Sequence, residues 1–98
     1  MATTRRVTKA RPELEPPANT VSQLELVGFF HKKSVHELVV VEIAPGLYRL
    51  EAIIAWRVGR WTLVGARGPR NFRSLDTLAK HLKTMGAGRT VTRLELLT

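Results

Sequence analysis

The sequence predicts one small α+β domain, an antiparallel β-meander with a single helix packed on one face of the sheet. Two patterns support this fold class: apolar and polar side chains alternate from 47 to 56, and leucines recur at helical spacing between 74 and 85. The 98 residues are enough for one hydrophobic core. The predicted order is β-β-β-β-α-β, with three strands before the helix if the first segment is not a strand.

The first 19 residues have the composition of an arm and not of a folded element. They contain hardly any large apolar side chain, and their charged residues lead into a Glu-Pro-Pro sequence. Such a segment buries too little apolar surface to offset the entropy lost on ordering. We therefore predict a disordered basic arm with a proline-rich spacer over 1–19 and a single α+β domain over 20–98.

The stretch 21–30 is the least regular part of the predicted domain. Its apolar residues fit neither strict alternation nor one helical stripe, and Gly28 interrupts both patterns. We interpret it as a strand, and a helix remains the open alternative. Residues 37–43 are rich in β-branched side chains and end at Ala44-Pro45-Gly46, which predicts a strand followed by a turn.

Alternation from 47 to 56 predicts a strand with one buried face. Arg49 and Glu51 point to the opposite face. Gly59 lies in the short connection that follows and allows a tight reversal into a strand over 61–67, which completes the meander. The side chains on the buried face are Tyr48, Leu50, Ala52, Ile54 and Trp56.

The helix has the clearest local signals in the chain. Ser74 stands as its N-cap and Gly86 at the position of a left-handed C-cap, and alternation over 90–97 then predicts a last strand. Phe72, just before the cap, is expected to anchor the preceding loop in the core. The apolar stripe is expected to pack on the face of Leu50, Ile54 and Trp56. That stripe consists of Leu75, Leu78, Ala79, Leu82 and Met85.

Composition excludes several classes of protein. Because the chain has no cysteine, disulfides, zinc fingers, iron–sulfur clusters and thiol catalysis are excluded. No apolar run approaches the ~20 residues of a membrane helix, and the first residues lack the apolar stretch of a signal peptide. We expect a cytoplasmic protein with no membrane partner.

Positive charge is concentrated in the second half of the predicted domain. From 57 to 93 nine basic residues accompany one acidic residue, a net of +8, whereas 21–56 has a net of −1. The loop 67–73 carries three arginines at three-residue spacing, and arginine forks suit phosphate oxygens. The predicted nucleic-acid-binding residues are Arg60, Arg67, Arg70, Arg73, Lys80, Lys83, Arg89 and Arg93, with Arg5 and Arg6 in the arm.

Two other interpretations of these charges stay open, docking on an acidic protein surface and a simple role in solubility. Tyr48 and Trp56 fit the core better than a base-stacking platform, whereas Trp61 is less certain because it lies at a turn. The three histidines lack metal-ligand spacing, and no nucleophile has a base nearby in the sequence. The sequence therefore predicts no enzyme, no metal site and no cofactor, and it leaves a homodimer open.

One part of the sequence resembles a known family of proteins. It consists of Arg67-Gly68-Pro69-Arg70-Asn71-Phe72-Arg73-Ser74-Leu75-Asp76, followed by a predicted helix, a glycine turn and a short strand. The stretch 61–96 resembles small basic accessory proteins of bacterial plasmids and integrating elements, described as partition-associated and ParC-like. This resemblance implies a bacterial mobile-element origin and a role beside DNA maintenance or inhibition of host defence, with no catalytic residue assigned.

The expected function is that of a non-enzymatic accessory protein of a bacterial mobile element that binds nucleic acid, DNA first, through its basic face. The alternative is a protein-interaction module or inhibitor. It would dock the same face on an acidic surface of a partition, transfer or host-defence complex such as a restriction or CRISPR system.

Overall fold

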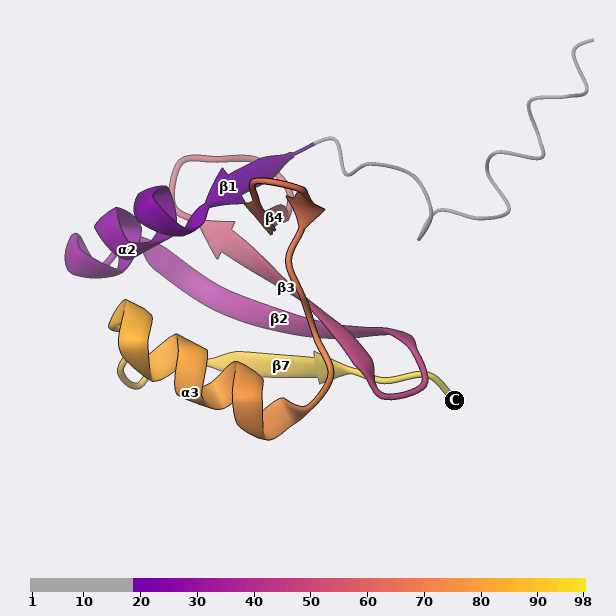
Figure 1. Cartoon of the computed structure of the whole chain (residues 1–98). Coiled ribbons are helices and arrows are strands. Elements are labelled where there is room, and N and C mark those ends of the chain that lie inside the picture. Colours follow the sequence, from indigo (N-terminus) through magenta and orange to yellow (C-terminus); the bar gives the residue numbers. More distant parts are fainter. Residues whose placement is uncertain (1–18) are drawn as a thin grey trace, which may run out of the picture.

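The computed structural model describes residues 19–98, so the arm predicted over 1–19 and its Arg5 and Arg6 lie outside the described residues, apart from Asn19. The described chain folds as an α+β unit with a seven-stranded mixed sheet and two helices (Figure 1), which confirms the predicted class. In chain order the elements are β1 (Thr20–Ser22), α2 (Gln23–His31), β2 (Val35–Ala44), β3 (Leu47–Ile54), β4 (Trp61–Gly65), β5 (Gly68–Pro69), β6 (Asn71–Phe72), α3 (Leu75–Met85) and β7 (Thr92–Glu95).

The sheet has the strand order β1-β4-β3-β2-β7, with β5 added to β4 and β6 to β3. Strands β2, β3 and β4 are antiparallel neighbours, so the centre of the sheet is the predicted meander. Both edge strands are parallel to their neighbours, β1 to β4 and β7 to β2, and the prediction of an antiparallel meander is wrong there. Each edge strand pairs with a distant part of the chain, and local alternation carries no information about such a pairing.

The first segment of the predicted domain is mainly a helix, so the strand predicted for 21–30 is wrong beyond β1. Ser22 caps α2 through a capping box: its hydroxyl accepts from the backbone N–H of Glu25 at 3.1 Å, and the Glu25 carboxylate accepts from the backbone N–H of Ser22 at 2.9 Å. Leu26 and Phe30, one turn apart, are buried. Leu24 and Val27 of the same helix are exposed, so the apolar residues of this segment do not form one clean helical stripe in the sequence.

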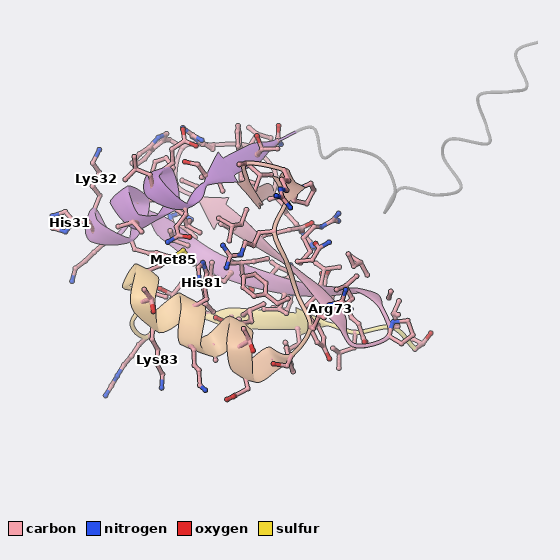
Figure 2. All side chains as sticks on the ribbon, viewed as in Figure 1. His31, Lys32, Arg73, His81, Lys83 and Met85 are labelled. Atoms are coloured by element: carbon pink, nitrogen blue, oxygen red, sulfur yellow. The ribbon has the colours of Figure 1, made fainter. Side chains whose placement is uncertain are left out.

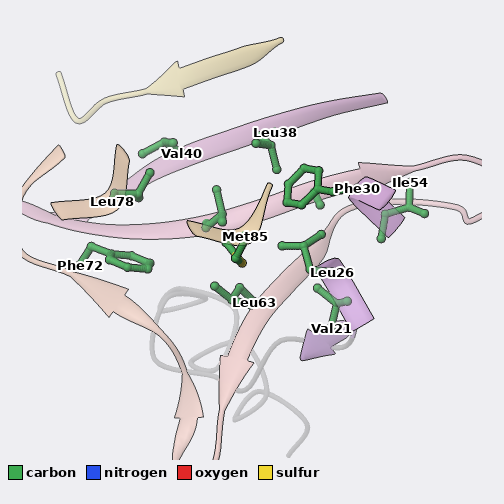
Figure 3. Close-up of a cluster of buried hydrophobic side chains, with 12 residues drawn as sticks. Val21, Leu26, Phe30, Leu38, Val40, Ile54, Leu63, Phe72, Leu78 and Met85 are labelled. Atoms are coloured by element: carbon green, nitrogen blue, oxygen red, sulfur yellow. The ribbon is translucent and has the colours of Figure 1, made fainter. Parts of the chain in front are cut away.

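Both helices pack on one face of the sheet and enclose the core with it (Figures 1 and 3). From Leu38 onward the even-numbered side chains of β2 point to this face, as those of β3 do. A β-bulge between Val35 and Glu37 shifts the alternation at the start of β2, so that Val35 also packs against the core. The opposite face carries no helix and is called the open face below. The fully buried core side chains are Val21, Leu26, Leu38, Val40, Leu50, Ala52 and Leu63, with Ile54, Phe72, Leu78, Met85 and Phe30 beside them.

Helix α3 follows the sequence prediction closely. The Ser74 hydroxyl accepts from the backbone N–H of Thr77 at 3.0 Å, and Gly86 ends the helix in the left-handed conformation with φ of 87°. Leu78 and Met85 are buried, and Leu82 is partly buried against the core. Two residues of the predicted stripe differ from the expectation: Leu75, which lies in the first turn at the rim of the sheet, is 38% exposed, and Ala79 is exposed as well.

Trp56 is not part of the core. Strand β3 ends at Ile54, and the backbone N–H of Arg57 then donates to the Ile54 carbonyl oxygen at 3.1 Å, which closes a turn. This turn interrupts the alternation before it reaches Trp56, whose side chain is 74% exposed. The expectation that Trp56 lies under the helix is therefore wrong.

The arginine-rich loop 67–73 contains a tight hairpin. Strand β4 turns at Ala66-Arg67 and pairs back with β5, so the strand predicted over 61–67 is two residues shorter. Phe72 pairs with Tyr48 of β3 and is 3% exposed, which confirms its predicted anchoring role. The last strand is also shorter than the predicted 90–97, because only Thr92–Glu95 pairs with β2.

Candidate nucleic-acid interface

Every acidic side chain among residues 19–98 already has a partner within the fold. Three form ion pairs on the open face, one pairs with Lys80 at 3.5 Å, and two accept backbone N–H groups. The backbone N–H of Ser22 lowers the pKa of Glu25, and that of Gly46 lowers the pKa of Glu42. In the order of the three groups, the acidic residues are Glu37, Glu51 and Glu95; Asp76; and Glu25 and Glu42.

The open face carries a connected set of charged side chains, which we call the open-face network. Arg60 is its centre: it donates to Glu51 at 3.1 Å and to the two carboxylate oxygens of Glu95 at 2.8 and 2.7 Å. The hydrogen bonds that Arg60 donates lower the pKa of Glu95, and its hydrogen bonds to Glu95 first and Glu51 second raise the pKa of Arg60. The network members are Arg49, Glu51, Arg60, Glu95, Arg93 and Glu37.

The open-face network has two consequences. Val39 is fully buried although no helix covers this face, because the long side chains of the network lie across it. Arg60 and Arg93, both predicted to bind nucleic acid, form ion pairs within the fold. Lys80, a third predicted residue, is paired with Asp76 on the surface of α3.

Seven exposed cations of residues 19–98 form no ion pair with the described part of the chain. They fall into two groups at different ends of α3, whose 11 residues span about 16 Å. Figure 2 shows this division, with Lys32 and Lys83 at one end of the molecule and Arg73 toward the other. The first group, the turn cluster, is Lys32, Lys33, Lys83 and Arg89; the second, the hairpin cluster, is Arg67, Arg70 and Arg73.

Three of the four members of the turn cluster line two adjoining hollows at the C-terminal end of α3. Lys33 and Arg89 line the first, of about 360 Å³, and Lys83 lines the second, of about 470 Å³. The segment Gly86-Ala87-Gly88 contributes to both, so backbone with little side chain forms the wall between them. An extended polyanion can approach this surface closely, because two glycines leave it without bulk.

The turn cluster adjoins the connection between β3 and β4. The backbone N–H of Ala55 donates to the carbonyl oxygen of Ser34 at 2.8 Å, which brings Trp56 beside the turn that contains Lys33. Lys33 and Trp56 are the only residues of 19–98 other than glycine with positive φ, and the value is 57° for each. Such a conformation costs a bulky residue free energy, and residues that keep it are concentrated at functional sites.

The connection that carries Trp56 is held in place by a stacked arginine. The guanidinium carbon of Arg57 lies 4.7 Å from the centre of the Phe29 ring and 4.6 Å from that of the Trp61 ring. The indole N–H of Trp61 donates to the carbonyl oxygen of Val58 at 3.1 Å. Trp61 thus belongs to the scaffold of the connection, while the exposed Trp56 is presented by it.

The hairpin cluster is built on Phe72. Arg67 lies in the turn between β4 and β5, and the guanidinium of Arg70 lies 5.5 Å from the centre of the Phe72 ring. The other neighbour of that ring is His81, at 5.4 Å between ring centres. Burial, and then the positive charge of Arg70, lowers the pKa of His81, because both disfavour the protonated imidazole.

The predicted basic surface is therefore divided and partly reassigned. The structure groups Lys83 with Arg89 and groups Arg67 with Arg70 and Arg73, and it places Arg60, Arg93 and Lys80 in ion pairs. Lys32, Lys33 and Trp56 were not among the binding residues predicted from the sequence. The run His31-Lys32-Lys33 was a visible signal, but it lay in a stretch with a net negative charge, and its neighbours in space come from two other turns.

Other kinds of site are not seen in the described part of the chain. No three His, Asp or Glu side chains among residues 19–98 are grouped so as to hold a metal ion. Neither of the two helices there is long and apolar enough to cross a membrane. In comparisons with protein-family models, curated proteins and solved structures, none matches this chain.

Proposed function

We propose that this protein is a non-enzymatic nucleic-acid-binding protein that holds phosphates with the turn cluster and stacks an unpaired base on Trp56. The hairpin cluster supplies a second phosphate contact along the same strand. The observation that carries the proposal is the division of charge: every acidic side chain of residues 19–98 is engaged within the fold, and seven exposed cations are left without an acidic partner.

The exposed indole supports a single strand over a duplex as the ligand. Proteins that bind single strands combine a cationic surface with aromatic side chains on which bases stack, and each stacked base contributes about 1–3 kcal/mol. Trp56 is 74% exposed and lies beside Lys33, so one residue of each kind is available at one place. Bases in a duplex are stacked on each other and cannot use such a platform.

The experiment is a fluorescence-anisotropy titration of the full chain with labelled oligo(dT), with the matching duplex and with oligo(U), at increasing NaCl. We expect the single strands to bind more tightly than the duplex, and log K to fall linearly with log salt by about 0.7 for each phosphate contacted. Lys33→Ala should weaken binding about tenfold, equivalent to about 1.4 kcal/mol.

Lys80→Ala is the matched control, because it removes the same charge from a lysine that is already paired with Asp76. It should change the affinity far less than Lys33→Ala. Equal effects of the two variants would show that only the overall charge of the protein matters. Affinity independent of salt would overturn the proposal altogether.

A second candidate, an interaction module for an acidic protein, is favoured by one observation. Val58 lies close to Trp56 in the same connection and is 91% exposed, and phosphate binding gives no reason for this apolar side chain. A pull-down from a nuclease-treated bacterial extract separates the two functions. A partner that stays bound after nuclease and is lost with Val58→Asp favours the protein partner, whereas loss of all bound material with nuclease favours the first candidate.

A further inference from the structure

Strand β7 forms an open edge of the sheet. It is the last strand in the order β1-β4-β3-β2-β7 and pairs only with β2. Its apolar side chains are unusually exposed for a strand: Leu94 is 49% exposed, and Leu96, just beyond the strand, is 55% exposed. Natural edge strands are commonly protected from pairing by charges, proline or bulges, and an apolar edge of this kind is a site of association.

The backbone groups available on this edge can be assigned residue by residue. The carbonyl oxygen of Val91 accepts from the backbone N–H of Leu38 in β2, and the backbone N–H of Leu97 points to the Glu42 carboxylate on the same side. Alternate residues of a strand direct their N–H and C=O groups to opposite edges. The odd-numbered residues 91–97 therefore face β2, and Thr92, Leu94 and Leu96 offer their N–H and C=O groups to a further strand.

From this geometry we propose that β7 binds β7 of a second copy of the chain, antiparallel and about a two-fold axis at Leu94. The sheets of the two copies then become continuous. Three antiparallel registers bring the free backbone groups of two copies opposite each other, and charge selects between them. Centring the pair on Arg93 opposes two arginines, and centring it on Glu95 opposes two glutamates. Centring it on Leu94 opposes Arg93 to Glu95 of the partner subunit in both directions.

The side chains support the same register. On the helix-covered side, Leu94 meets its own copy, and Thr92 lies opposite Leu96 of the partner subunit. Two copies thus cover the apolar side chains that one copy leaves exposed.

Engineered disulfides test both the dimer and its register, because the chain has no cysteine of its own. Residues opposed as a hydrogen-bonded antiparallel pair have Cα atoms about 5.5 Å apart, within disulfide range. Leu94→Cys should therefore cross-link to a dimer on mild oxidation. Leu96→Cys is the matched control, since it is similarly exposed but lies about 14 Å from its own copy in this register. Cross-linking of Leu96→Cys alone would overturn the register.

Sedimentation equilibrium of the unmodified chain gives the second test. We expect a mass approaching twice 11.0 kDa, and Leu94→Lys should return it to the monomer value because two lysines then meet on the axis. Leu24→Lys, an equally drastic change at an 83% exposed leucine of α2, should leave the dimer intact. A monomeric wild type at all concentrations would refute the proposal. Neither measurement involves nucleic acid, so this inference stands or falls independently of the proposed function.

Discussion

Lys33 and Trp56 share the left-handed backbone conformation, in two turns that the hydrogen bond from Ala55 to Ser34 joins. At Lys33 this conformation ends helix α2: Lys33 donates to Phe30 and Ser34 donates to Phe29, the two bonds of a Schellman motif. Helix α3 ends in the same kind of turn with Gly86, the residue that this position normally favours. The lysine and the tryptophan are therefore the unusual choices at these positions, and the function proposed above gives a reason for them.

Glycine at either position should separate stability from function. Lys33→Gly and Trp56→Gly remove left-handed strain but also loosen the unfolded chain, so we expect a free energy of unfolding that is unchanged or higher by up to about 1 kcal/mol. Both variants should bind oligo(dT) at least several-fold more weakly. Urea denaturation and anisotropy measure the two quantities, and a large loss of stability in either variant would contradict the assignment.

The hairpin cluster should be functional without contributing to stability. Replacing Arg70 and Arg73 together by Ala should weaken oligo(dT) binding and leave the melting temperature nearly unchanged, because exposed charges contribute little to stability. Phe72→Ala should instead lower the melting temperature strongly, because Phe72 is 3% exposed. The expected loss of unfolding free energy is about 3–5 kcal/mol. If the double arginine variant binds like the wild type, the turn cluster acts alone.

The two ends of the apolar stripe of α3 should differ in their contribution to stability. Leu78 is 3% exposed and Leu75 is 38% exposed. Leu78→Ala should cost about 2–5 kcal/mol of unfolding free energy, a large share for a chain of this size. Leu75→Ala should cost less than about 1 kcal/mol. Chemical denaturation of both variants checks the contrast, and similar losses would mean that the first turn of α3 is packed more tightly than the structure shows.

His81 should make stability depend on pH below neutrality. Its pKa in the folded chain is lowered from 6.5, by burial first and by Arg70 second, and its Nε2 atom is buried without a hydrogen-bond partner. Between the folded and the unfolded pKa the unfolded chain binds more protons, so stability is present above about pH 6.5 and is lost as pH falls through this interval. Thermal melts should show this slope above the range in which the carboxylates titrate. His81→Leu should flatten it, and an unchanged slope in that variant would assign the effect elsewhere.

Elements whose signals lie within a few residues were predictable from the sequence. The sequence of helix α3 contains a capping residue at each end, Ser74 and Gly86. Phe72 lies just before the N-cap and is buried, so it anchors the preceding loop. Helix α2 also carries a local signal, the pair Ser22 and Glu25 of its capping box, but the prediction for this segment used only the irregular apolar pattern and did not consider that pair.

Features that depend on distant residues were not predictable by these patterns. Trp56 lies outside the core because a turn follows Ile54 and because the backbone N–H of Ala55 donates to the Ser34 carbonyl oxygen. The alternation of apolar and polar residues indicates neither of these hydrogen bonds. The parallel edges and the open-face network, in which Arg60 meets Glu95, likewise join parts of the chain that are far apart in sequence. For the same reason, charge counted along the chain identified the arginines of the hairpin cluster but not the pairing that neutralises Arg60.

The parallel edge formed by β7 also orders the events of folding. Strands β2, β3 and β4 meet through short connections, whereas pairing Leu38 with Thr92 closes most of the described chain into a loop and costs more entropy. The central strands are therefore expected to assemble first and β7 last. Until β7 has docked on β2, no neighbouring strand holds β7 in an extended conformation. A partly folded chain therefore cannot present the free edge of β7 to another molecule. If two copies pair through β7 as proposed above, late docking restricts that pairing to chains in which β7 has already joined the sheet.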